Sequence, residues 1–164
     1  FKKDFDHNGK LASKGNINPP LLRSLLNHKF FKISPPKSTG FEEFNEKWLQ
    51  SHLSKIKGIK KIDVLSTLTY FTIITVVNEI NRFNPKSKNI YFCGGGSNNL
   101  LLVQGILSLS DKIRQTRICP GVDEKNLESL SFAWLSMIRK KSQKITNTTI
   151  TGSRKSRLLG SIYR

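Results

Sequence analysis

The sequence predicts an α/β domain built around a largely parallel sheet. Two short segments rich in strand-forming residues, 89–93 and 113–119, alternate with two longer segments of helical periodicity, 99–109 and 123–141. Strands that alternate with helices are typical of βαβ units, whose strands run parallel. The length of 164 residues and the hydrophobic content of 37% suffice for one domain, or for a large piece of a longer protein, with its own core.

The first helix is expected to begin at Asn18, because Asn is a favoured N-cap and Pro19 suits the first helical position. An apolar stripe at helical spacing follows and should face the core. The stripe consists of Leu21, Leu22, Leu25 and Leu26. We expect this helix to end near Lys29, with Phe30 and Phe31 anchoring its exit in the core.

A loop is expected over residues 32–40, since Pro35 and Pro36 cannot lie inside a helix. Thr39 and Glu42 have the spacing of a capping box, so a second helix should begin there. The spacing of three aromatic residues predicts one buried face on that helix. These residues are Phe41, Phe44 and Trp48.

Residues 64–82 form a long segment without Gly or Pro, and Asp63 can cap it as a helix. Its Thr, Ile and Val content favours a strand locally, whereas its length favours a buried helix, and we choose the helix on length. The apolar run within it, 64–77, has 14 residues. A membrane span needs roughly 20 apolar residues. We therefore expect a core element and no membrane association.

The second half of the chain is expected to begin with a short strand at 89–93 and a helix at 99–109. A second strand should cover 113–119, and Asp123 can cap a last helix that ends at about Lys141. Most apolar side chains of that helix are expected to be buried. They are Leu127, Leu130, Phe132, Trp134 and Met137.

The chain carries 28 Lys and Arg against 11 Asp and Glu, a formal net charge of +17. A basic surface attracts phosphate polymers, so a basic polyanion-binding module stays open as the weakest of our hypotheses. The basic residues are scattered, however, without interleaved aromatic residues or recognition-helix spacing, so nucleic acid is not expected as a partner. The codon use of an AT-rich genome explains the charge without any such partner.

The cysteine and histidine residues give no catalytic or metal site. Cys93 and Cys119 lie far apart without a CxxC motif, and we expect both to be buried small hydrophobes. His7, His28 and His52 have neither metal-ligand spacing nor a nucleophile partner, and we expect them at the surface or at helix ends. We therefore assign no catalytic residue and no metal ligand.

The most informative local feature is the run Gly94, Gly95, Gly96 and Ser97, which connects the first strand to a helix. Glycines let the backbone approach a ligand, and a helix N-terminus favours anionic groups. The run is not a Walker A loop, and Asn99 stands where a dinucleotide fingerprint needs its third Gly. A plain turn between strand and helix explains the same pattern, so both explanations stay open on the local chemistry.

A second feature is the loop residues Lys37, Ser38, Thr39 and Gly40. A Lys with two hydroxyls and a glycine could bind a phosphate or a sugar carboxylate. The hydroxyls could equally do no more than cap the next helix.

Taken together, these motifs resemble the anhydro-N-acetylmuramic acid kinase family. The resemblance covers essentially the whole chain in the right order, and its most specific segments are PPKSTG at 35–40 and CGGGS at 93–97. The other matching residues are Gly9, Ala12, Gly15, Leu21, Leu22, Phe30, Phe31, Glu42, Phe44, Asn45, Trp48, Leu49, Asp63, Val64, Thr67, Leu68, Asn99, Glu128, Phe132, Ala133, Trp134, Leu135, Thr151, Gly152, Ser153, Leu159, Gly160, Ser161, Ile162 and Tyr163.

The resemblance implies the C-terminal domain of the sugar-kinase, actin and heat-shock ATPase type, with a mixed, mostly parallel sheet flanked by helices. It implies a helical lead-in with the PPKSTG loop at 1–62 and a nucleotide-side α/β domain at 63–164. The implied activity is phosphorylation of anhydro-N-acetylmuramic acid by ATP and Mg²⁺, with hydrolytic opening of the anhydro ring. The product, N-acetylmuramic acid 6-phosphate, feeds peptidoglycan recycling. A cytoplasmic location in bacteria and a homodimer of full-length chains are also implied.

By resemblance, Gly94, Gly95, Gly96 and Ser97 would lie against the adenosine or the phosphates of ATP, with Asn99 supporting the turn. The role of the PPKSTG loop stays open between the substrate and an interdomain contact. The general-base aspartate and the Mg²⁺ ligands are expected in the family's N-terminal part, which this chain does not contain. We therefore expect the chain by itself to be inactive.

Two departures from the family pattern leave a choice between two hypotheses. Phe41 and Asn98 stand where the family usually has Arg. The chain is expected to be a C-terminal fragment or split subunit of the kinase, pairing with a separately encoded N-terminal half. The alternative is a non-catalytic remnant of that kinase.

Overall fold

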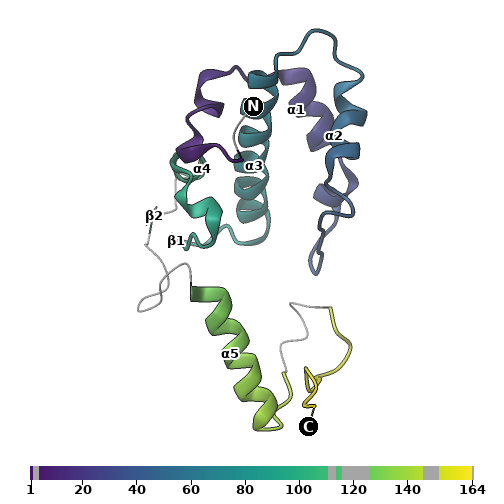
Figure 1. Cartoon of the computed structure of the whole chain (residues 1–164), viewed down its shortest axis with the longest axis vertical. Coiled ribbons are helices and arrows are strands. Elements are labelled where there is room, and N and C mark those ends of the chain that lie inside the picture. Colours follow the sequence, from purple (N-terminus) through teal and green to yellow (C-terminus); the bar gives the residue numbers. More distant parts are fainter. Residues whose placement is uncertain (2–3, 111–113, 116–125, 146–151, 164) are drawn as a thin grey trace.

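The computed structural model describes residues 1, 4–110, 114–115, 126–145 and 152–163 (Figure 1). The α-helices are α1 (Pro19–Leu26), α2 (Glu46–Leu53), α3 (Lys61–Phe83), α4 (Leu100–Ser108) and α5 (Leu127–Lys140). Short 3₁₀ turns are η1 (His7–Gly9), η2 (Ala12–Lys14), η3 (Lys29–Lys32) and η4 (Gly95–Asn98), and the strands are β1 (Asn89–Ile90) and β2 (Arg114–Gln115). The described part of the chain is therefore mostly helical.

Helix α3 is the element against which α1, α4 and η2 pack, as Figure 1 shows for the two helices. Its length and its lack of Gly and Pro predicted a helix, and the structure confirms it. Its threonines fit because their hydroxyls donate back to carbonyls four residues earlier, for example Thr67 to Asp63 at 2.6 Å and Thr72 to Leu68 at 3.0 Å. Such bonds satisfy a polar β-branched side chain inside a helix.

Asp63 does not cap α3, so that part of the prediction is wrong. The N-cap is Lys60, and Asp63 lies in the first turn, where its carboxylate accepts a hydrogen bond from the Asn16 amide at 2.8 Å. Thr67 Oγ1 in turn accepts from the Asn18 amide at 2.9 Å. The start of α3 thus holds the chain segment that enters α1.

Helix α1 begins as predicted, with the Asn18 side chain accepting from the Leu21 amide at 2.9 Å. Leu21 and Leu25 are completely buried. The helix ends at Leu26, earlier than expected, because His28 caps the following turn η3 through a hydrogen bond from the Phe30 amide. Capping by a side chain stops a helix where propensity alone would extend it.

The core lies between α3 and α4. Ile73 and Val77 of α3 pack with Ile106 of α4, and Ile90 and Phe92 add partly buried side chains at the edge. These contacts place the β1 end of the chain beside α3, so that the bend after β1 is held by the core.

The second helix begins later than the capping-box spacing predicted. Asn45 is the N-cap of α2, accepting from the Trp48 amide at 3.0 Å, and Thr39 Oγ1 instead donates to Glu43 Oε2 at 2.8 Å. Asn45 also donates to the carbonyl of Phe41 at 3.0 Å, which closes a turn ahead of the helix. Asn45 uses both the oxygen and the nitrogen of its side-chain amide, and it therefore takes the capping position in place of Thr39.

The buried aromatic face was predicted for three residues and holds for two. Phe41 is 82% exposed, because it lies in the turn ahead of α2. Phe44 and Trp48 are half-buried, with ring centroids 4.9 Å apart, and Phe31 and Phe71 join the same cluster. This cluster joins η3 and α2 to α3.

Strands β1 and β2 pair in parallel, with Asn89 opposite Arg114 and Ile90 opposite Gln115. The parallel direction is confirmed, but each described strand has two residues, so the extended sheet is not found in the described ranges. Residues 116–119 of the expected second strand, Cys119 included, lie outside those ranges. Cys93 is exposed rather than buried, because β1 ends before reaching it.

Helix α5 runs from Leu127 to Lys140, later than predicted. Its N-cap is Asn126 and not the expected Asp123, which lies outside the described residues. Figure 1 shows α5 set apart from α1–α4. The prediction that its apolar side chains are mostly buried is wrong, since Phe132 is 63% exposed and Trp134 is 48% exposed. Their apolar surface is left uncovered by the described part of the chain.

No helix in the described ranges combines the length and the apolar character needed to cross a membrane.

Replacement of Gly15 by Ala tests the packing of the N-terminal segment on α3. A Cβ at Gly15 would lie 2.5 Å from the Ile62 carbonyl oxygen, which is backbone and cannot rotate away. We expect Gly15→Ala to lower the free energy of unfolding by about 1–3 kcal/mol in urea denaturation, as overpacking does.

Gly95→Ala is the matched control, because a Cβ there meets no described atom within 4 Å. Its stability should equal or slightly exceed that of the unchanged chain. Equal losses of stability in Gly15→Ala and Gly95→Ala would contradict the close packing of Gly15 on α3.

Candidate functional site

The run of glycines after β1 forms a tight bend. Gly94 has φ +74° and ψ −178°, a region that is essentially restricted to glycine. Ser97 closes the bend, because its hydroxyl donates to the Gly94 carbonyl at 2.7 Å and its amide donates to the same oxygen at 3.1 Å. The bend delivers the chain from β1 into α4.

The outer face of this bend is open. A Cβ built on Gly94, Gly95 or Gly96 would meet no described atom within 4 Å. Gly105 differs, because a Cβ there would lie 3.1 Å from Ile73 Cγ1. Packing within the described chain therefore explains Gly105 but not Gly95 or Gly96, whose backbone is accessible to a group from outside.

A cleft of about 910 Å³ lies against the bend. Its second wall is an N-terminal segment, residues 5–8, and its third is the α3 face that carries Leu65 and Thr69. Gly95, Gly96, Ser97 and Asn99, which the sequence singled out, all line this cleft. Its volume lies within the range of small-molecule sites.

The N-terminal wall is fixed by two features. Asp6 accepts hydrogen bonds from the Leu11 and Ala12 amides at 2.8 and 2.9 Å. Gly9, at φ +72°, approaches so closely that a Cβ would lie 2.8 Å from Asn99 Oδ1. The turn η1 is therefore held directly against the start of α4.

Asn99 links the two walls. Its side chain caps α4 by accepting from the Leu101 and Leu102 amides at 3.1 and 3.3 Å, and it also faces Gly9. The expectation that Asn99 supports the turn thus has a physical basis in capping.

Sequence reasoning missed the N-terminal wall. Phe5, Asp6, His7 and Asn8 all line the cleft, and the rings of Phe5 and His7 lie 6.2 Å apart. Phe5 is 71% exposed and is an apolar residue of the cleft lining. In the sequence, the local indication that this segment packs closely is the three-residue spacing of Gly9, Ala12 and Gly15.

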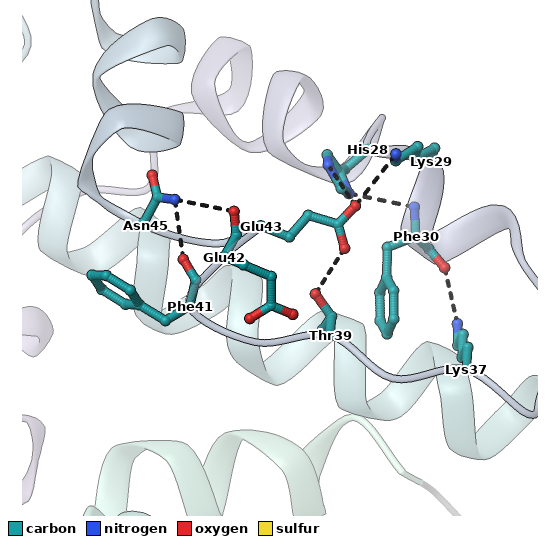
Figure 2. A network of polar contacts seen from close by, with 9 residues as sticks. All are labelled: His28, Lys29, Phe30, Lys37, Thr39, Phe41, Glu42, Glu43 and Asn45. Atoms are coloured by element: carbon teal, nitrogen blue, oxygen red, sulfur yellow. Dashed lines mark hydrogen bonds and ion pairs between the residues drawn. The ribbon is translucent and has the colours of Figure 1, made fainter. Parts of the chain in front are cut away.

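The PPKSTG loop lies elsewhere, bound to the other half of α3. Lys37 Nζ forms an ion pair with Glu79 Oε2 at 2.8 Å and donates to the Phe30 carbonyl at 3.1 Å (Figure 2 shows the latter contact). The same ammonium lies 4.5 Å from the centre of the Phe30 ring, and the Lys37 side chain is only 9% exposed. Lys37 therefore anchors the loop to the chain itself.

Thr39 is engaged in a polar network around Glu43 (Figure 2). Glu43 Oε1 lies 3.6 Å from Lys29 Nζ and 3.8 Å from His28 Nε2. The hydrogen bond from Thr39 and then the charges of Lys29 and His28 lower the pKa of Glu43. The network ties the loop to η3.

The structure does not bring the two motifs together. Lys37, Ser38, Thr39 and Gly40 are absent from the lining of the glycine cleft. Thr69 lines the cleft, whereas Glu79, which holds Lys37, lies ten residues further along α3. Ten residues correspond to roughly 15 Å along a helix.

A different motif segment does reach the loop. A Cβ at Gly152 would lie 3.2 Å from Pro36 Cγ, so the described C-terminal residues pass beside PPKSTG. The same residues pair with the segment that follows α5, since Ile145 and Arg157 form an antiparallel bridge. Two segments that match the family pattern therefore meet at Pro36.

Metal-ligating residues are not clustered in the described ranges. No group of three or more His, Cys, Asp or Glu is placed there to hold a metal ion. Of the histidines, His28 caps η3 and His7 lines the glycine cleft.

Comparison with known proteins identifies the family. The family model for anhydro-N-acetylmuramic acid kinase matches residues 1–164. The chain belongs to the anhydro-N-acetylmuramic acid kinase family. Its relatives include the kinase of Shewanella denitrificans, which is 37% identical over 164 residues, or 99% of this chain and 44% of the relative. The kinase of Idiomarina loihiensis is 38% identical over 159 residues, or 96% of this chain and 43% of the relative.

The anhydro-N-acetylmuramic acid kinase of Pseudomonas fluorescens is 34% identical over 163 residues, or 98% of this chain and 45% of the relative. The chain thus spans less than half the length of these curated relatives. Membership of the anhydro-N-acetylmuramic acid kinase family accords with an α/β class, although the described strands are short.

Replacing Lys37 by Met tests the anchoring of the loop. The change keeps the length of the side chain but removes its ion pair, its hydrogen bond and its contact with the Phe30 ring. We expect the free energy of unfolding to fall by about 1–3 kcal/mol, since the part-buried Phe30 carbonyl and the Glu79 carboxylate lose their partner.

A double-mutant cycle with Glu79→Gln isolates the ion pair. Lys37→Met and Glu79→Gln should couple by about 0.5–3 kcal/mol, as contacting residues do. Additive effects of the two substitutions would show that the pair does not hold the loop.

Proposed function

We propose that this chain is the nucleotide-side part of an anhydro-N-acetylmuramic acid kinase, as a fragment or split subunit that acts together with the part of the kinase that it does not match. The joint reaction would open the anhydro ring with water and transfer the terminal phosphoryl group of ATP to the freed oxygen of the sugar. The proposal takes residues 63–164 as the nucleotide-side domain and residues 1–62 as a lead-in packed on α3.

The open glycine bend is the observation that carries this proposal. Gly95 and Gly96 lack any packing reason within the described chain, and a side chain at either position would fill the space that a ligand needs. Backbone that is free of side chains can approach phosphate or ribose closely. The residues present therefore fit ATP.

The division of roles among the cleft residues follows from their contacts. The backbone of Gly95, Gly96 and Ser97, which line the cleft, would hold the nucleotide. Gly94, expected with them from the sequence, lies behind the lining and closes the bend by accepting from Ser97, while Asn99 keeps the bend and α4 in register. When bound, ATP supplies the phosphoryl group that is transferred, and Mg²⁺ would accompany its phosphates. The apolar Phe5 and Leu65 would exclude water from one side of the cleft.

Asp6 is not a candidate for the base. Its carboxylate already accepts two backbone hydrogen bonds, to Leu11 and Ala12, and so serves the fold. The proposal therefore assigns the general base and the Mg²⁺ ligands to the part of the kinase that this chain does not match. By itself the chain would bind ATP without turning over the sugar.

The alternative is a non-catalytic remnant of the kinase. The exposed Phe41, where the family usually has Arg, and the exposed apolar side chains of α5 favour it. Complementation decides between the two proposals.

The direct experiment combines this chain with the part of the Shewanella denitrificans kinase that it does not match. Phosphorylation of anhydro-N-acetylmuramic acid is measured with both polypeptides and with each one separately. We expect activity only in the mixture, and about 100-fold less with Gly95→Val, because a displaced nucleotide misaligns the reacting atoms.

Gln104→Val, at an exposed position of α4, is the matched control and should keep the activity of the mixture. If the chain is folded and binds ATP but the mixture has no activity, the result would support the non-catalytic remnant. Equal activity of the Gly95→Val and Gln104→Val mixtures would remove the glycine cleft from the reaction.

A further inference from the structure

A second cavity, of about 870 Å³, lies between α1 and α2, away from the glycine bend. The two helices are joined there by a hydrogen bond of 2.6 Å between Ser24 Oγ and His52 Nδ1. The His52 ring also packs against Trp48, with centroids 5.0 Å apart. We call this cavity the α1–α2 groove.

The cationic lining of the groove has one carboxylate partner, Glu43, among the described residues. Arg23, Lys29 and Lys55 all line it. Lys29 shares Glu43 with His28, at 3.6 and 3.8 Å. Arg23 and Lys55 form no ion pair with any residue in the described ranges.

The pKa of His52 is affected by the positive charges around it. Burial first, and then the charges of Lys55 and His28, lower the pKa of His52 below its ordinary value of 6.5. No carboxylate contributes to that shift. An anion in the groove would offset the two charges and favour the protonated ring.

We propose that the α1–α2 groove is a binding site for the phosphate group of a small phosphorylated molecule, held by Arg23 and Lys55. A phosphate monoester carries close to two negative charges at neutral pH. The planar guanidinium of Arg23 can donate two parallel hydrogen bonds to it, and the ammonium of Lys55 adds a compact charge. The groove has room for the organic part beside Leu26 and the His28 ring. This site is independent of the proposed nucleotide cleft.

The test follows the His52 ring signals by NMR during pH titrations of the 164-residue chain. Titrations are run in sodium chloride, in inorganic phosphate and in glucose 6-phosphate, all at equal ionic strength. We expect either phosphate compound to raise the pKa of His52 above its value in chloride, with saturation at a defined concentration. The two phosphate arms distinguish a free phosphate from a sugar phosphate as the preferred ligand.

Arg23→Gln combined with Lys55→Gln should weaken phosphate binding by roughly tenfold or more, as the loss of charge-assisted bonds does. Lys47→Gln combined with Lys140→Gln removes the same charge from exposed positions outside the groove and should leave binding unchanged. Each single substitution is measured as well, so that the test does not depend on one doubly changed chain.

Two results would overturn the site. One is a pKa of His52 that is the same in chloride, in inorganic phosphate and in glucose 6-phosphate. The other is an equal loss of phosphate binding in the groove variant and in the control variant.

Discussion

The close approach of residues 6–15 to α3 and α4 is the constraint on which the rest of the structure depends. Gly9 lies against Asn99, and Gly15 lies against the Ile62 carbonyl, at distances that no side chain would permit. Ser66 of α3 donates a hydrogen bond to the Ala12 carbonyl at the same interface. These contacts fix one wall of the glycine cleft relative to the other two. A cleft therefore exists because the chain is glycine at the points of contact, and not only at the bend itself.

Helix α3 separates the two motifs that the sequence singled out. Its first half lines the cleft through Leu65 and Thr69. Its last turns hold the PPKSTG loop through Glu79 and the preceding turn η3 through Arg82. Arg82 donates to the Phe31 carbonyl at 3.0 Å, next to the aromatic cluster. The loop is consequently fastened to η3 and α3 in the described chain. Within the described residues, α3 is the element that connects this loop to the glycine cleft.

Much of the fold could be predicted from the sequence where local chemistry and tertiary packing agree. The start of α1 at Asn18, the helical state of α3 and a helix directly after the glycine bend are of this kind. Predictions of N-caps failed for two reasons. Asn45 took the capping position of α2 in place of Thr39, and Asp63 accepts a hydrogen bond from a distant part of the chain instead of capping α3. The glycine side of the cleft was visible as a motif. Its N-terminal wall was not, because only long-range packing places Phe5 and His7 there.

The most direct test of the account is to map ATP onto the chain by backbone amide shifts, at an ionic strength matched with sodium chloride. The account predicts saturable shifts for the amides of Gly95, Gly96 and Ser97, which line the glycine cleft. Shifts confined to the α1–α2 groove, with the glycine amides unchanged, would show that the chain attracts ATP through its charge and would contradict the account.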